Sequence, residues 1–463
     1  MNTLQTPFRV SFCDGDSQTS ITLRAGHHFR LYPVGVRGNV SERLTARMVD
    51  LLRLSQGVVV ADGLLRRNAA SAGFRSPHLE IEVIDHDFWN GQEVARTLKT
   101  CLDFLSGGDD WQIRFVPDQT VRHHYQPEFT FTEPTTVCLY SGGLDSAAGL
   151  AARLREQPDR TYIPVVVRHQ FLRGSLVKRQ FDLLKRWNGV DPSRFLPLIV
   201  AAFVRNNRLN REFGLRTRET SHRCRSFLFT ALASVVAAIE GSDRVEIYES
   251  GIGAVNLPLT DGMLGWRTTR SSHPHFLRTM SQLVSLVVGR KLTLELPFID
   301  QTKASLVAAL AKSGQSELAL ATVSCILHPL RRGNTKQCGF CPACIYRRYA
   351  LQFADIHEPR QAYHYDLFGS VTDFKRVPEK RLRPLLAFLR QVDRLAELDR
   401  DGAVPRFFRN HLLGTKVIRD EASLAPFVEL FRRYRREWLD LAARGQTRQW
   451  LWADWLAPRK VAV

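Results

Sequence analysis

The spacing of hydrophobic and polar residues changes near residue 134. Before that point, HLEIEVID (78–85) and WQIRFV (111–116) alternate apolar and polar positions, as half-buried strands do. ERLTARMVDLLRLSQG (42–57) instead has the three- and four-residue spacing of a helix. These patterns predict an N-terminal mixed α+β domain of unknown role over residues 1–130.

After residue 134 the pattern becomes strand, glycine-rich loop, helix and strand, in TVCLYSGGLDSAAGLAARLREQPDRTYIPVVVRHQ (136–170). Its two almost wholly apolar strands indicate a βαβ unit and a parallel sheet covered on both faces. Residues 226–250 add a helix and a strand, and residues 303–314 add a further helix. We therefore expect an α/β domain with a doubly wound parallel sheet over residues 131–350.

Residues 351–463 are basic and have helical patterning, which we expect to be broken at Pro378, Pro384, Pro405 and Pro426. The apolar content of 44% and charged content of 24% are those of a soluble globular protein. No apolar run approaches the roughly 20 residues of a membrane span, and the first residues do not resemble a signal peptide. A cytoplasmic protein without a membrane partner is expected.

The formal net charge of +19 is large, and arginines are concentrated in residues 205–226, 381–394 and 431–438. Such charge attracts polyanions, so nucleic acid is one candidate partner. A solvated basic surface without a dedicated partner explains the charge equally well. The sequence leaves both interpretations open, and it leaves open a homo-oligomer.

The loop Ser141–Ser146, with the sequence SGGLDS, follows an apolar strand and opens an alanine-rich helix. Glycines allow a tight turn that brings backbone N–H groups close to a ligand, and the helix directs its positive end at the same place. Two serine hydroxyls suit phosphate oxygens, and the Asp145 carboxylate is a suitable ligand for Mg²⁺. The alternative is a glycine–serine turn without a function.

Four of the eight cysteines lie close together in the sequence, with the spacing C-x12-C-x2-C-x2-C. Four thiolates suit tetrahedral Zn²⁺ and leave no open position, so a structural zinc is expected. Redox chemistry at Cys341 and Cys344 is the alternative. The predicted zinc ligands are Cys325, Cys338, Cys341 and Cys344.

The SGGLDS loop resembles the pyrophosphate loop of PP-loop ATP pyrophosphatases, whose fold is HUP-like. Together with SC…CGFCPAC, it is similar to the 7-cyano-7-deazaguanine synthase (QueC) family. This resemblance implies that Ser141, Gly142, Gly143, Leu144, Asp145 and Ser146 bind ATP. It also implies roles for Arg168 and His169 after the second strand, Arg225 before an apolar helix, and Lys303 at a Thr-Lys-Ala helix start. For each of the three cations, the alternative is a surface residue without a role in the site. For His169, the alternative is a histidine in the core.

The middle loop of the QueC family is replaced here by ESGIGAVNLPLTDGMLGWRTTRSSHPHFLR (249–278). Gly251 and Gly253 would let a flat base lie against the backbone, and Asn256 offers a paired donor and acceptor. Arg270, Ser271, Ser272 and His273 supply a cation, hydroxyls and an imidazole in one short segment. The candidate catalytic residues are Asp145, Lys303, Arg270 and His273.

Long extensions on both sides of the motifs resemble the QueC-like proteins of bacterial antiphage defence systems of the Qat and CBASS types. That resemblance implies an ATP-dependent ligase, using Mg²⁺ and structural Zn²⁺, that adenylates a 7-carboxy-7-deazaguanine-type carboxylate and forms an amide or a nitrile. A protein amine from a partner in the same operon is a candidate acceptor. The alternatives are a housekeeping 7-cyano-7-deazaguanine synthase, a tRNA-modifying PP-loop enzyme and a nucleotide sensor without catalysis.

Overall fold

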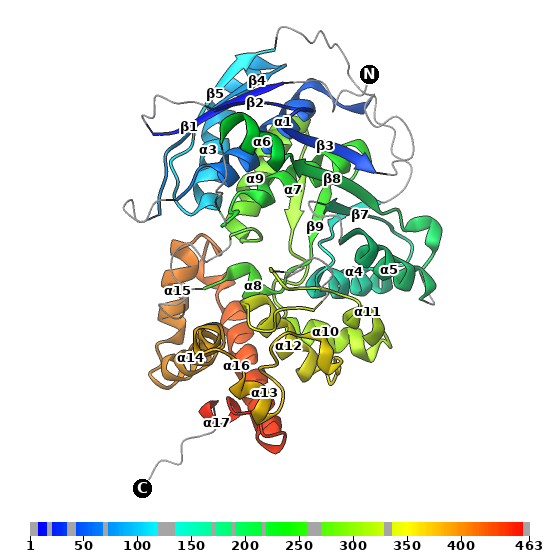
Figure 1. Cartoon of the computed structure of the whole chain (residues 1–463), viewed down its shortest axis with the longest axis vertical. Coiled ribbons are helices and arrows are strands. Elements are labelled where there is room, and N and C mark those ends of the chain that lie inside the picture. Colours follow the sequence, from blue (N-terminus) through cyan, green and yellow to red (C-terminus); the bar gives the residue numbers. More distant parts are fainter. Residues whose placement is uncertain are drawn as a thin grey trace.

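The computed structural model describes residues 8–15, 21–34, 43–67, 73–118, 135–168, 173–187, 190–214, 219, 221–257, 259, 270–327 and 336–456. Figure 1 shows the N-terminal elements, in blue and cyan, at one end of the molecule and the C-terminal helices, in orange and red, at the other. A central sheet with its helices lies between them. None of the helices in these ranges is long and apolar enough to cross a membrane.

The central sheet has the strand order β10-β9-β6-β7-β8-β3. The five strands from β6 to β10 are parallel. β3 pairs antiparallel with β8, the outermost of the parallel strands on that side. The parallel strands thus follow the order of a doubly wound sheet, and the direction of winding reverses between β6 and β9. The expected parallel α/β sheet is confirmed. The strands are β3 (Phe29–Val34), β6 (Thr135–Leu139), β7 (Thr161–Arg168), β8 (Leu198–Val204), β9 (Arg244–Ile247) and β10 (Thr293–Glu295).

The two faces of this sheet bury side chains in two separate cores. Along β6, Val137 belongs to one core and Cys138 to the other, because successive side chains of a strand point to opposite faces. One face is covered by α4 (Leu144–Glu156), α5 (Arg173–Arg186), α10 (Lys303–Lys312) and α11 (Ser316–Leu320). The other is covered by α7 (Arg225–Ile239) and α9 (Pro274–Val288), with α6 (Asn206–Phe213) nearby.

The N-terminal region forms a second sheet with the order β2-β1-β4-β5. Helix α1, which is buried along most of its length, packs on this sheet and on α7, and α3 packs on α9. Strand β3 leaves this region and joins the central sheet, a pairing that we did not predict. It covers the exposed edge of β8. The elements are β1 (Arg9–Asp14), β2 (Ile21–Arg24), α1 (Ala46–Leu64), β4 (Pro77–Val83), α2 (His86–Asn90), α3 (Gln92–Ser106) and β5 (Gln112–Pro117).

The C-terminal region is helical, as predicted, and packs into the core that contains α4 and α10. One expectation about its breaks is wrong, because Pro384 lies inside α14 and does not end it. A proline inside a helix has no backbone N–H and so removes one hydrogen bond, yet α14 continues to Arg400. Pro378, Pro405 and Pro426 do stand at helix starts. The helices are α12 (Pro342–Phe353), α13 (Val371–Lys375), α14 (Glu379–Arg400), α15 (Val404–Gly414), α16 (Ala425–Thr447) and α17 (Ala453–Leu456).

Candidate functional site

The loop from Ser141 to Ser146 connects the end of β6 to the first turn of α4. Gly142 has a φ of 76°, which favours glycine, and a Cβ there would lie 3.0 Å from the Val177 side chain. Gly143 is the N-cap of α4 and makes no side-chain capping bond, so no side chain of its own competes for the amides of the first turn. The loop can therefore present backbone N–H groups and the positive end of α4 to an anion.

Hydrogen bonds hold this loop from both sides. The amide of Gln180 on α5 donates to the carbonyls of Gly142, at 3.2 Å, and Ala321, at 2.9 Å. The Tyr140 hydroxyl donates to Gln180 Oε1 at 2.6 Å. On the other side, the Leu144 N–H donates to Ser324 Oγ at 3.4 Å. Ser324 immediately precedes Cys325, so the loop is linked to the cysteine cluster.

A cavity of about 460 Å³ opens beside the loop, at the carboxyl ends of β6, β7 and β9. This is the crevice where the winding direction reverses, the usual ligand position in such sheets. The structure brings most of the predicted nucleotide residues to it, and Ser271 and Ser272 as well. Its lining includes Ser141, Gly143, Asp145, Ser146, Arg225 and Lys303.

Lys303 begins α10, and its ammonium forms an ion pair with Asp145 Oδ2. Their side chains are only 8% and 13% exposed, so a surface role for Lys303 is excluded. The Lys303 Nζ also lies 4.6 Å from the centre of the Tyr346 ring, a cation–π contact. Asp145 Oδ1 is buried and accepts no hydrogen bond from the described part of the chain. This oxygen is available to a ligand or a cation in the cavity.

Glu249 is a cavity residue that the sequence analysis did not single out. Burial raises the pKa of its carboxyl to about 8, the nearby Asp145 carboxylate adds to the rise, and Lys303 opposes it. Gly253 makes room for this side chain, because a Cβ there would lie 2.4 Å from Glu249 Oε1. The signal that could have found it is its place just after strand β9, where parallel sheets carry functional groups.

Arg270 and His273 lie against α3. Arg270 donates to the Phe104 carbonyl at 3.0 Å and covers the Phe104 ring at 4.8 Å. His273 is buried, packs on the same ring and caps α9 by accepting from the His275 N–H at 3.1 Å. Burial, followed by the nearby Arg270, lowers the pKa of His273 to about 3. Neither residue is in the cavity lining, and this packing favours structural roles.

Four other predicted residues have limited or different placements. Arg168 is the last residue of β7, but its side chain and His169 lie outside the described residues. A Cβ on Gly251 would lie 1.9 Å from the Ile299 carbonyl oxygen, so this glycine permits close backbone packing and not the approach of a base. Asn256 ends α8 (Gly251–Val255) in a left-handed conformation with a φ of 45°.

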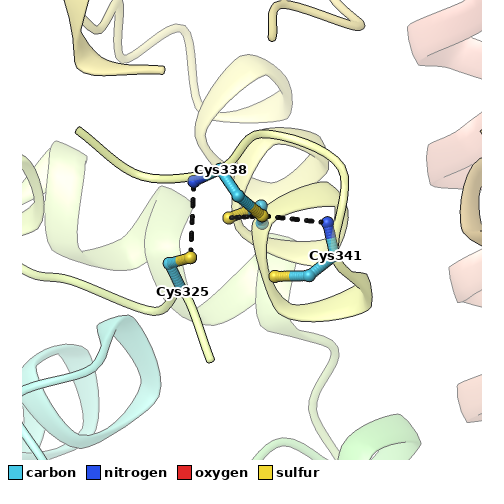
Figure 2. A group of neighbouring side chains, drawn as sticks. Cys325, Cys338 and Cys341 are labelled. Atoms are coloured by element: carbon cyan, nitrogen blue, oxygen red, sulfur yellow. Dashed lines mark hydrogen bonds between the residues drawn. The ribbon is translucent and has the colours of Figure 1, made fainter. Parts of the chain in front are cut away.

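The four clustered cysteines meet in a buried site at the N-terminal end of α12. Figure 2 labels three of them, Cys325, Cys338 and Cys341. Their sulfur atoms all lie within 4.8 Å of one another, and no disulfide is formed among them. The Cys338 and Cys344 sulfurs are 3.7 Å apart, close to the roughly 3.8 Å that tetrahedral Zn–S bonds require. Backbone N–H groups donate to the Cys325 and Cys338 sulfurs at 3.3 Å. The donor set fits a structural zinc ion.

The sheet and its cavity define the class of open α/β proteins that bind ligands beyond the carboxyl ends of parallel strands. Residues 269–355 match the family model described as Queuosine biosynthesis protein QueC. The matched segment contains Lys303 and all four clustered cysteines, and it confirms the predicted resemblance to the QueC family. No curated protein matches the chain.

Proposed function

We propose that this protein is a QueC-like, ATP-dependent ligase that adenylates a carboxylate in the cavity beside Ser141–Ser146. The observation that carries the proposal is the buried Lys303–Asp145 pair next to the start of α4. A buried cation and the positive end of α4 suit a polyphosphate, and the buried Asp145 Oδ1, which has no partner among the described residues, suits a cation bound to it. The match of residues 269–355 to the QueC family supports the same chemistry.

In this proposal, the Ser141 and Ser146 hydroxyls and the amides at the start of α4 hold the two terminal phosphates. Lys303 and Arg225, which line the same cavity, stabilise the negative charge that develops on the innermost phosphate during attack by the substrate carboxylate. Asp145 Oδ1 would hold Mg²⁺, which neutralises phosphate charge. Zinc at the four cysteines would fix the position of Ser324 and so of the loop. Arg168 and His169 remain predicted nucleotide contacts.

The proposed substrate is a 7-carboxy-7-deazaguanine-type carboxylate, with an amide or a nitrile as product. Ser271, Ser272 and Glu249 line the cavity and offer polar groups to a base. With domains at 1–130, 131–350 and 351–463, the resemblance of the two extensions to those of QueC-like antiphage proteins supports the proposal of an antiphage role with a protein amine as a possible acceptor. The housekeeping nitrile synthase and the tRNA-modifying enzyme are the other candidates.

The test is exchange of labelled pyrophosphate into ATP, with and without 7-carboxy-7-deazaguanine. Adenylation predicts exchange that depends on the carboxylate and is lost in Asp145→Asn. Mass spectrometry of the products then separates the acceptors: a free nitrile supports the housekeeping reaction, and a mass increase on a co-encoded protein supports the conjugating one. ATP cleavage that ignores the carboxylate would overturn the substrate assignment.

A further inference from the structure

Glu437 of α16 reaches from the C-terminal region to the start of α10. Its side chain is buried, and the residue is only 5% exposed. One carboxylate oxygen accepts a hydrogen bond from the Thr302 hydroxyl at 2.6 Å, and the other accepts one from the Tyr349 hydroxyl. Thr302 is the N-cap of α10 and directly precedes Lys303. An acid from the C-terminal extension therefore contacts the residue next to the proposed phosphate-binding lysine.

The bond to Glu437 orients the cap. The Thr302 hydroxyl has one proton, and its two possible acceptors are Glu437, at 2.6 Å, and Ser305 Oγ, at 3.0 Å. The charged and closer carboxylate is the stronger acceptor. With the proton on that side, a lone pair of Thr302 Oγ1 faces the Ser305 N–H, which donates to it at 3.0 Å. This is the bond that fixes the first turn of α10.

A stack of aromatic rings from α12 and α16 also reaches Lys303. Tyr346, whose ring lies under the ammonium, is stacked with Tyr349 at 5.6 Å and an interplanar angle of 5°. Tyr349 is stacked in turn on Trp438, the neighbour of Glu437 in α16, at 4.8 Å and 10°. Helix α16 is thus connected to Lys303 in two ways, through the N-cap residue Thr302 and through the stacked rings. Glu437 takes part in both, because it accepts hydrogen bonds from Thr302 and from Tyr349.

We propose that α16 positions Lys303 for its ligand through Glu437, so that the C-terminal extension is part of the machinery of the site and not an added surface. Glu437 is a positioning residue, because it acts through Thr302 and Tyr349 and is not among the residues that line the cavity beside the loop. The expected effect of Glu437 on the reaction with ATP rests on the proposed function. Its effect on the position of Lys303 can be measured even if that function is wrong.

The test compares Glu437→Gln with Tyr434→Phe in the full chain. The glutamine NH2 group cannot accept a hydrogen bond, so one of the two hydroxyls loses the acceptor of its proton. Tyr434 lies on the same helix and bonds Gln391 at 3.0 Å, so its variant removes a comparably buried hydroxyl contact that does not involve Thr302. Thermal melting shows whether both variants are folded, and all comparisons are made below the lower melting temperature.

The first measurement is acetylation of lysines by limiting acetic anhydride, quantified by mass spectrometry. Lys291, an exposed lysine that follows α9, is the internal reference. Glu437→Gln is expected to raise the ratio of Lys303 to Lys291 acetylation, whereas Tyr434→Phe and Thr302→Ser, which keeps the hydroxyl, leave it at the wild-type value. Equal ratios in Glu437→Gln and Tyr434→Phe would overturn the proposal.

The second measurement is carboxylate-dependent pyrophosphate release. We expect kcat/KM for ATP to fall about tenfold in Glu437→Gln, in line with the loss of one charge-assisted hydrogen bond, and to be retained in Tyr434→Phe. A wild-type protein without this activity would contradict the proposed function, yet the acetylation ratio would still decide the role of Glu437. An active wild type with an unchanged ratio in Glu437→Gln would contradict the positioning role alone.

Discussion

The Lys303 ammonium and the Asp145 carboxylate form a buried ion pair between residues 158 positions apart in the sequence. Each lies in the first turn of a helix, Asp145 in α4 and Lys303 in α10. An acid is favourable at a helix N-terminus, but a cation is not, because the positive end of the helix repels it. The chain thus keeps an electrostatically unfavourable lysine in a cavity, a pattern expected where the cation has a ligand to bind.

Replacing Lys303 with methionine should abolish ATP-dependent pyrophosphate release, with a loss of at least about 100-fold in kcat/KM if Lys303 stabilises the transition state. Methionine keeps most of the length of the side chain but removes the cation that opposes the rise in the pKa of Glu249, so the pKa of that carboxyl should rise further. Lys312→Met, on the same helix but outside the lining of the cavity, is the control. Activity is compared by pyrophosphate release and folding by circular dichroism. Wild-type turnover in Lys303→Met would exclude Lys303 from the reaction.

The sequence was sufficient to predict the parallel sheet, the tight turn at Ser141–Ser146 and the cluster of four cysteines, because each has a local pattern. The apolar strands, the SGGLDS turn and the four cysteines all carry their information in short segments, and Lys303 was singled out through its Thr-Lys-Ala context. Glu249 was missed although it directly follows strand β9, because its raised pKa depends on burial and on the charge of Asp145. Glu437 was missed because no local pattern indicates its hydrogen bond with Thr302, 135 positions away in the sequence. Arg270 and His273 were predicted at the site from their side-chain chemistry alone. In the structure both pack against Phe104 of α3, and neither lines the cavity.

The cysteine cluster should hold about one zinc ion per chain, detectable by metal analysis of the purified protein. Cys338→Ser should lose the zinc and much of the stability, because a structural metal contributes directly to folding. Cys13→Ser is the matched control, since Cys13 lies on β1, far outside the cluster in the sequence. Wild-type protein that contains no zinc and has the same melting temperature as Cys338→Ser would refute a structural metal.

Substitution of Gly251 distinguishes a packing role of this glycine from a ligand-binding role. Gly251→Ala should destabilise the fold by about 3 kcal/mol or more, because the new Cβ would overlap the Ile299 carbonyl oxygen, a backbone atom that cannot turn away. Gly63→Ala in α1 is the control. A Cβ at Gly63 meets nothing within 4 Å, so this change should be neutral or stabilising by up to about 1 kcal/mol. Urea unfolding measures both, and a stable Gly251→Ala would restore the ligand-binding interpretation.

His273 should make the fold sensitive to acid. Its pKa is lowered to about 3, first by burial and then by the nearby Arg270, His275 and Arg278, against an ordinary value of 6.5. Between these two pH values the unfolded chain binds a proton that the folded chain does not. The free energy of unfolding should therefore fall as the pH drops below about 6.5, by up to about 1.4 kcal/mol per pH unit. His275, whose pKa is lowered to about 4, adds a similar slope.

His273→Asn keeps an acceptor at the N-cap of α9 but removes the titrating group. The variant should lose about half of the histidine-dependent slope between pH 6.5 and pH 5, while its stability near pH 8 stays within about 1 kcal/mol of the wild type. Urea unfolding of both proteins at matched pH values measures this difference, and the comparison cancels the effect of acid on the thiolate cluster, which both proteins share. Parallel curves of unfolding free energy against pH would show that His273 binds a proton in the folded chain as readily as in the unfolded chain, and its place as a neutral cap on α9 would have to be abandoned.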